Sequence, residues 1–73
     1  MLLSEIEQKE IGWGMEVKHL ETGTKCEVMG PVAEMMGKLG VMMAYYDKSS
    51  TRHMIVDPDE FHKFEVVTRK YYE

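Results

Sequence analysis

The chain has 73 residues, of which 44% are hydrophobic and 30% are charged, and its formal net charge at pH 7 is −4. A chain this short forms one domain that buries only roughly 60% of the surface it exposes when unfolded. The mixed composition excludes a disordered, collagen-like or coiled-coil chain, and the acidic balance disfavours non-specific binding to phosphate. No apolar run approaches the roughly 20 residues that span a bilayer, and the first residues are acidic where a signal peptide is basic. We therefore expect a cytoplasmic protein with no membrane contact.

Residues 1–13 form a separate N-terminal segment in the sequence pattern. Ser4 followed by Glu7 resembles a capping box and predicts one or two helical turns. A helix this short is marginal in water, so the segment must dock on the body of the protein to be ordered. Gly12 and Gly14 then interrupt the helix on either side of Trp13, which we expect either to cover the core or to be an exposed aromatic.

The next stretch, residues 14–30, predicts a hairpin. Apolar and polar residues alternate over 15–19 and again over 25–29, which is the period of an antiparallel sheet with one wet face. The turn is centred on residues 21–23, where Gly23 can take a positive φ. Cys26, the only cysteine, falls on the apparent core face, where we expect an inert, buried thiol.

Three further strands are predicted downstream. Residues 32–40 lack alternation and contain helix formers up to Gly37, which predicts one or two helical turns or an ordered loop. The continuous apolar run over 41–46 predicts a strand, followed by a hairpin turn and a strand over 51–57. Asp57 and Pro58 are then typical of the N-cap and first position of a 3-10 turn over 58–61, before a last strand over 64–67.

This order of elements, five short strands with a 3-10 turn before the last, resembles the SH3-like small β-barrel over residues 14–67. The opening hairpin, with Val17 and Val28 in its strands, is similar to that of KOW modules of ribosomal and transcription-factor proteins. Cys26 stands where those modules place a small residue, and Glu16 and Glu27 thin the basic residues that they direct at RNA. The resemblance implies a mostly-β, single five-stranded SH3-like barrel. The residues on either side of it predict a short N-terminal helical segment over residues 1–13 and a basic, aromatic tail over residues 68–73.

The residues that could perform chemistry do not form a recognisable catalytic or metal motif. His19, His53 and His62 lack the spacing of metal-binding motifs. No glycine-rich phosphate loop is present, and no nucleophile stands beside a base in a known pattern. We therefore expect no enzyme activity, no metal and no cofactor.

Methionines and aromatics suggest a binding surface instead. If alternate residues of each strand fill the core, then Met42, Ala44 and Tyr46 remain on the outer face of the third predicted strand. An exposed apolar patch on a small protein usually marks an interface, and methionine adapts to irregular partners. Two alternatives are that the N-terminal segment covers this face or that a homodimer does. The predicted protein-binding residues are Trp13, Met29, Met35, Met36, Met42 and Tyr46.

Two function classes follow from these surfaces. The first is a small, non-enzymatic protein-binding module that acts by stoichiometric occupation of a protein partner, as accessory or inhibitor proteins of bacteria or phages do. An aromatic cage for methylated lysine, built from Trp13, Tyr45 and Tyr46, is a variant of that class. The second is a nucleic-acid-binding KOW-type barrel, in which cations meet phosphates and tyrosines stack on bases. Its residues would be Lys48, Arg52, Arg69, Lys70, Tyr71 and Tyr72.

Overall fold

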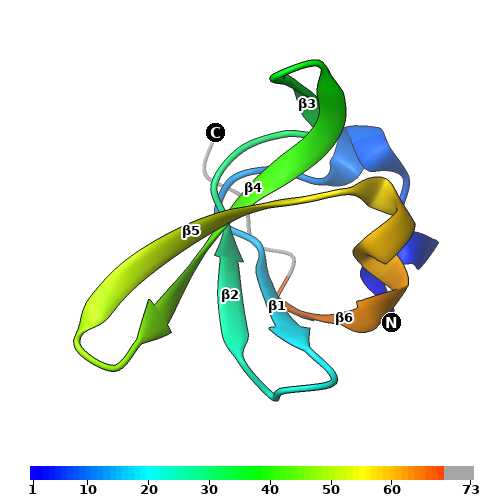
Figure 1. The fold of residues 1–73 in the computed structure, drawn as a ribbon. Coiled ribbons are helices and arrows are strands. Elements are labelled where there is room, and N and C mark those ends of the chain that lie inside the picture. The colour runs from blue at the N-terminus through cyan, green and yellow to red at the C-terminus, as the bar shows by residue number, and fades with distance from the viewer. Residues whose placement is uncertain (69–73) are drawn as a thin grey trace.

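The computed structural model describes residues 1–68, and their secondary structure is mostly β (Figure 1). Six strands form one antiparallel sheet, and three short 3-10 helices flank it. The strands are β1 (Glu16–His19), β2 (Lys25–Val28), β3 (Ala33–Met35), β4 (Lys38–Asp47), β5 (Ser50–Val56) and β6 (Phe64–Thr68). The 3-10 helices are η1 (Leu3–Glu5), η2 (Gln8–Glu10) and η3 (Pro58–Lys63).

The predicted opening hairpin is β1 and β2. Val17 pairs with Cys26, and both side chains are buried, as the alternation of polar and apolar residues requires. Gly23 supplies the left-handed residue of the turn with a φ of 74°, and its N–H donates to the carbonyl of His19 at 2.7 Å. The hairpin thereby fixes which side chains face the core.

Strand β4 connects most of the sheet, because it pairs with β2, β3 and β5 (Figure 1). The order along the sheet is β3-β4-β2-β1-β6, with β5 on β4. Within residues 1–68 no pairing joins β5 to β6, so the sheet is not closed into a barrel. The prediction of a mostly-β domain is confirmed, whereas the five-stranded barrel is not: the sheet has six strands and stays open.

The additional strand is β3, in the region predicted to be helical or a loop. It pairs with the start of β4 across the two-residue turn of Met36 and Gly37, whose φ angles are 52° and 82°. Two positive φ angles are typical of a type I′ turn, the geometry that suits a tight hairpin. Pairing with β4 thus overrides the helix propensity of Ala33, Glu34 and Met35.

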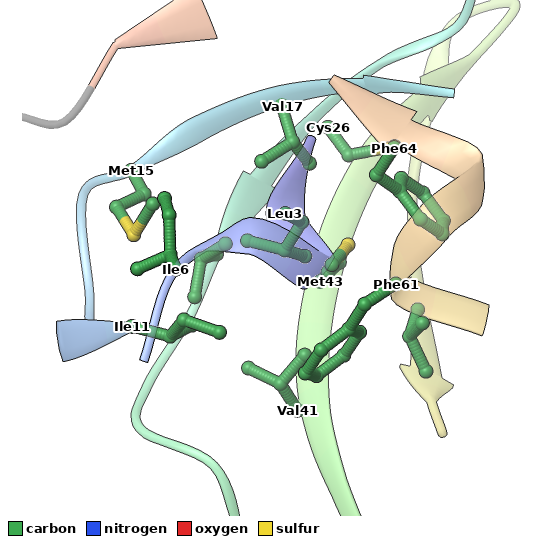
Figure 2. Close-up of a cluster of buried hydrophobic side chains, with 12 residues drawn as sticks. Leu3, Ile6, Ile11, Met15, Val17, Cys26, Val41, Met43, Phe61 and Phe64 are labelled. Carbon is green, nitrogen blue, oxygen red and sulfur yellow. The ribbon is translucent and has the colours of Figure 1, made fainter. Parts of the chain in front are cut away.

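The core lies on one face of the sheet and includes the N-terminal segment (Figure 2). Leu3 and Ile11 are at most 1% exposed, and η1 lies against η3 and β6. The main chain ties the segment to β6, where the N–H of Val66 donates to the carbonyl of Met1 at 2.8 Å and Leu2 bridges to Glu65. The buried residues are Leu3, Ile6, Ile11, Met15, Val17, Cys26, Val28, Val41, Met43, Val56, Phe61 and Phe64.

Local hydrogen bonds begin the 3-10 helices. The carboxylate of Glu5, rather than that of Glu7, accepts a bond from a backbone N–H three residues earlier, at Leu2. At η3 the predicted cap is present, since Oδ1 of Asp57 accepts from the N–H of Asp59 at 2.9 Å. This cap orients η3 so that Phe61 enters the core.

Candidate protein-binding face

The outer face is the side of β1, β2, β4 and β5 that points away from the core. Strand alternation defines it, because successive side chains point to opposite faces of a sheet. The strand register arranges its side chains in rows that run across the strands. We name these the apolar row (Met29, Met42, Ile55), the acidic row (Glu16, Glu27, Ala44, His53) and the basic row (Lys18, Lys25, Tyr46, Thr51).

The apolar row is formed by one residue from each of three neighbouring chain segments. The N–H of Met29 donates to the carbonyl of Met42 at 2.8 Å, and Met42 pairs with Ile55. The three side chains are 36%, 37% and 46% exposed, respectively. Each one therefore offers apolar surface to solvent beside that of its neighbour.

Ile55 of the apolar row also lines a cleft at the β3–β4 hairpin. This cleft of about 270 Å³ is lined by apolar residues together with Lys38 and Asp57. The apolar members are Met35, Met36, Leu39 and Ile55. Met36 is 96% exposed at the tip of the turn and Leu39 is 47% exposed. The row and this cleft together form one continuous surface, which we call the apolar stripe.

A larger cleft of about 670 Å³ lies beside the row, over the small side chain of Ala44. Glu16 and Glu27, which pair directly across β1 and β2, contribute acidic groups to its lining. Tyr46 and His53 line it from β4 and β5. Lys25 also lines this cleft, which therefore offers both signs of charge and the aromatic ring of Tyr46 to polar groups of a binding partner.

Like charges stand opposite one another in two rows. Glu16 pairs with Glu27, and Lys18 pairs with Lys25. Directly opposed like charges destabilise a sheet by a few tenths of a kcal/mol to about 1 kcal/mol. Within residues 1–68 none of the four takes part in an ion pair. Their charges therefore remain available to a partner.

The structure brings only some of the predicted protein-binding residues together. Met29 and Met42 are neighbours, Met35 and Met36 line the second cleft, and Tyr46, 76% exposed, lies in the basic row. Trp13 is 53% exposed ahead of β1 and lines neither cleft. Tyr45 and Tyr46 both line the larger cleft, but Trp13, the third residue of the predicted aromatic cage, does not.

The N-terminal segment does not cover the outer face. Leu3 and Ile11 pack with Val17 and Met43 on the opposite side of the sheet (Figure 2). Met42 stays exposed. That alternative explanation for the apolar face is therefore wrong. The N-terminal segment instead packs on the core face of the sheet.

Sequence reasoning missed two members of the apolar stripe. Ile55 lies between Met54, which packs on the core, and the buried Val56, so strict alternation over this strand would have placed it outside. Leu39 was assigned to a helix or loop because β3 was not expected. A predicted turn at Met36 and Gly37 would have placed Leu39 on a strand. Of these two residues, however, only Gly37 is typical of turns.

Of the residues predicted for nucleic-acid binding, the structure describes two, Lys48 and Arg52, and both belong to the β4–β5 hairpin. Lys48 is at the tip of the β4–β5 hairpin with a φ of 59°, and Arg52 forms an ion pair with Asp47, with Nε and Oδ2 3.1 Å apart. Both residues are exposed. The remaining members, Arg69, Lys70, Tyr71 and Tyr72, lie outside the described residues.

The groups that could perform chemistry are dispersed or inert. Burial raises the pKa of the Cys26 thiol, whose Sγ lies 3.8 Å from the carbonyl oxygen of Thr24. Among residues 1–68 no group of three or more His, Cys, Asp or Glu side chains could hold a metal ion. No helix in this part of the chain is long and apolar enough to cross a membrane.

Comparisons of this chain with protein-family models, with curated proteins and with solved structures found no match. The outer face, with its apolar stripe and its two charged rows, is therefore the feature from which function is inferred.

Proposed function

We propose that this chain is a non-enzymatic protein-binding module whose outer face occupies a protein partner stoichiometrically. The observation that carries the proposal is the apolar stripe, which stays open to solvent while the N-terminal segment packs on the opposite face of the sheet. Met29, Met42 and Ile55 each keep more than a third of their surface exposed. A contiguous apolar patch on a small protein is typical of an interface.

Burial of the exposed apolar side chains favours binding of a protein partner. Burying a Met or Ile side chain fully contributes roughly 1.5–3 kcal/mol relative to leaving it exposed. A partner that buries the exposed parts of these side chains would therefore gain a substantial part of this free energy on binding. Unbranched methionines also repack at low cost around an irregular surface.

A photo-crosslinking experiment tests the proposal. A benzoylphenylalanine placed at position 42 should crosslink a specific protein in an extract of the source cell, and Met42→Asp should abolish binding of that purified protein in a titration. Leu20, 47% exposed in the β1–β2 turn, offers the matched control for both the crosslinker and the Asp substitution. Equal crosslinking from positions 20 and 42, or unchanged binding by Met42→Asp, would refute the proposal.

The competing class, a nucleic-acid binder, predicts a different result. A fluorescent oligonucleotide would bind at physiological salt, and its affinity would fall steeply as salt rises. The same preparation can be tested in both assays. Salt-dependent oligonucleotide binding together with no partner at position 42 would favour the nucleic-acid function.

A further inference from the structure

We infer that the partner supplies an extended segment, which pairs as an added strand along the free edge of β5 over residues 51–55. This inference rests on the proposed function and deepens it, because Ile55, at one end of this edge, also belongs to the outer face that the partner occupies. The main-chain groups of β5 that point away from β4 carry the inference.

The register of the β4–β5 hairpin determines which groups point away from β4. Asp47 pairs with Ser50 across a two-residue turn, and the residues that flank such a turn exchange both of their main-chain hydrogen bonds. Hydrogen-bonded and non-hydrogen-bonded pairs then alternate along the two strands. Every second residue of β5, counted from Ser50, therefore bonds to β4, and the residues between them direct their N–H and C=O groups outward. These outward residues are Thr51, His53 and Ile55.

The outward groups are free to bind another chain. Within residues 1–68 they have no hydrogen-bond partner, and no other strand pairs with β5 on that side. All three residues are exposed. Alternating donors and acceptors along an edge match the main chain of an extended segment, which binds by adding a strand. The chemistry of this edge thus specifies what covers it.

The other edge strands of the described chain, β3 and β6, are less suited to this pairing. The start of the chain covers part of β6, since the N–H of Val66 donates to the carbonyl of Met1 and Leu2 bridges to Glu65. Strand β3 has only three residues, and a short edge strand offers few groups to a partner. By contrast, β5 has seven residues in unbroken register, with no proline or bulge to oppose pairing.

The side chain of Ile55 defines one residue of the partner segment. Side chains that stand directly opposite each other on neighbouring strands have Cβ atoms about 4.5–5.5 Å apart on the same face of the sheet. Ile55 is 46% exposed and lines the second cleft together with Met36 and Leu39. An apolar residue of the partner beside Ile55 would bury its exposed part. The segment therefore carries an apolar residue at this position and no proline where its N–H groups donate to β5.

A peptide selected from a random phage-displayed library provides the probe. The best binder is synthesised with a single N-methyl group at each position in turn, and each affinity is measured by calorimetric titration. Only alternate N–H groups of an added strand donate to β5. Methylation at those positions should therefore weaken binding about tenfold, and methylation between them should have little effect. An absence of binders, or equal effects at all positions, would overturn the inference.

Amide hydrogen exchange locates the bound peptide on the chain. In the chain alone, the amides of Thr51, His53 and Ile55 should exchange fast and those of Arg52 and Met54 slowly, because only the latter two donate to β4. A saturating amount of the peptide should slow the first three amides. Unchanged exchange at these amides would overturn the inference. Slow exchange in the concentrated chain without peptide would assign the edge to a second copy and would overturn it as well.

His53→Pro tests the edge by substitution. Proline at this position removes an outward N–H and leaves the bonds to β4 intact, and its ring obstructs an added strand. It should weaken binding of the selected peptide about tenfold, whereas His53→Ala, which keeps the N–H, should have a much smaller effect. Equal affinities of the two variants would contradict the added strand.

Two controls complete this experiment. Circular dichroism verifies that each variant is folded, and Thr51→Pro, compared with Thr51→Ala, replaces the pair at position 53 if His53→Pro is not. The protein captured through position 42 separates this inference from the proposed function. Binding of that protein that Met42→Asp abolishes and His53→Pro leaves unchanged would refute the added strand and leave the proposed function standing.

Discussion

Gly40 and Ile55 fit together only because Gly40 has no side chain. A Cβ atom at position 40 would lie 2.8 Å from Cγ2 of Ile55 and 3.1 Å from the carbonyl oxygen of Val56. The first contact is closer than real Cβ atoms show, and the second involves main chain that cannot rotate away. The bare backbone of Gly40 therefore leaves room for Ile55, which belongs both to the apolar row and to the lining of the second cleft.

Gly40→Ala should destabilise the protein by about 1–3 kcal/mol, the range typical of overpacking. Urea unfolding followed by tryptophan fluorescence measures the change. Gly30→Ala is the matched control, because nothing lies within 4 Å of its Cβ position, and it should be nearly neutral. Adding Ile55→Ala to Gly40→Ala should recover part of the loss, and equal effects of the two glycine substitutions would contradict this packing.

Met36→Asn should raise stability while weakening partner binding. Met36 has a φ of 52°, a left-handed conformation that asparagine tolerates better than an unbranched apolar residue. Because Met36 is 96% exposed, its replacement gives up almost no burial within the chain. We expect a gain of roughly 0.5–1 kcal/mol in the free energy of unfolding.

The same substitution removes an apolar side chain from the stripe, so the affinity for a protein captured through position 42 should fall. Leu20→Asn, made at an exposed residue without a positive φ, should produce neither effect. A loss of stability in Met36→Asn would show that the β3–β4 turn is not as described.

Leu3→Ala should destabilise the fold strongly although residue 3 lies near the chain start. Its side chain is fully buried among core residues, and truncating a buried leucine costs about 2–5 kcal/mol. Thermal unfolding by circular dichroism should show a large fall in Tm, with Leu20→Ala as an exposed control. A small effect at Leu3 would mean that the N-terminal segment is not part of the core.

Cys26 makes stability depend on pH in the alkaline range. Burial raises the pKa of the thiol in the folded state, so the unfolded chain releases this proton at a lower pH than the folded protein does. In that window the folded state holds more protons, and stability therefore falls as pH rises through the unfolded value of about 8.5.

Urea titrations at pH 7 and pH 9.5 should show this loss, and it should be smaller in Cys26→Ala, which has no thiol to ionise. Reaction of Cys26 with a thiol reagent should be slow in the folded protein and fast in urea. Fast reaction under native conditions would contradict the burial of Cys26.

Sequence patterns predicted the strands whose faces differ in polarity. The alternation around Val17 and Cys26 defined the first hairpin, and Asp57 with Pro58 defined the start of η3. They failed at β3, because Ala33, Glu34 and Met35 have helix propensity, whereas pairing with the start of β4 across the two-residue turn decides their conformation. Met36 adopts a left-handed backbone conformation, but methionine is not a residue type from which a turn is predicted.

For the N-terminal segment, docking on the body was predicted, with Leu3 and Ile6 on one apolar side, but the place of Ile11 in the core was not. Each 3-10 helix there has only three residues, so no period repeats along the segment that would assign Ile11 to the same face. The acidic and basic rows were also not predicted as rows, because they depend on the pairing between strands. Glu16 and Glu27 are eleven positions apart in the sequence and become neighbours only through the register of β1 and β2.

The bond between Met1 and Val66 has a consequence for the rate of folding. It joins two segments that are far apart in the sequence, and β1 likewise pairs with the distant strand β6. Contacts between residues so far apart in sequence make folding slow, because a long loop must close before they form. Until β6 pairs with it, β1 keeps an unpaired edge, and such an edge is a site at which partly folded chains associate.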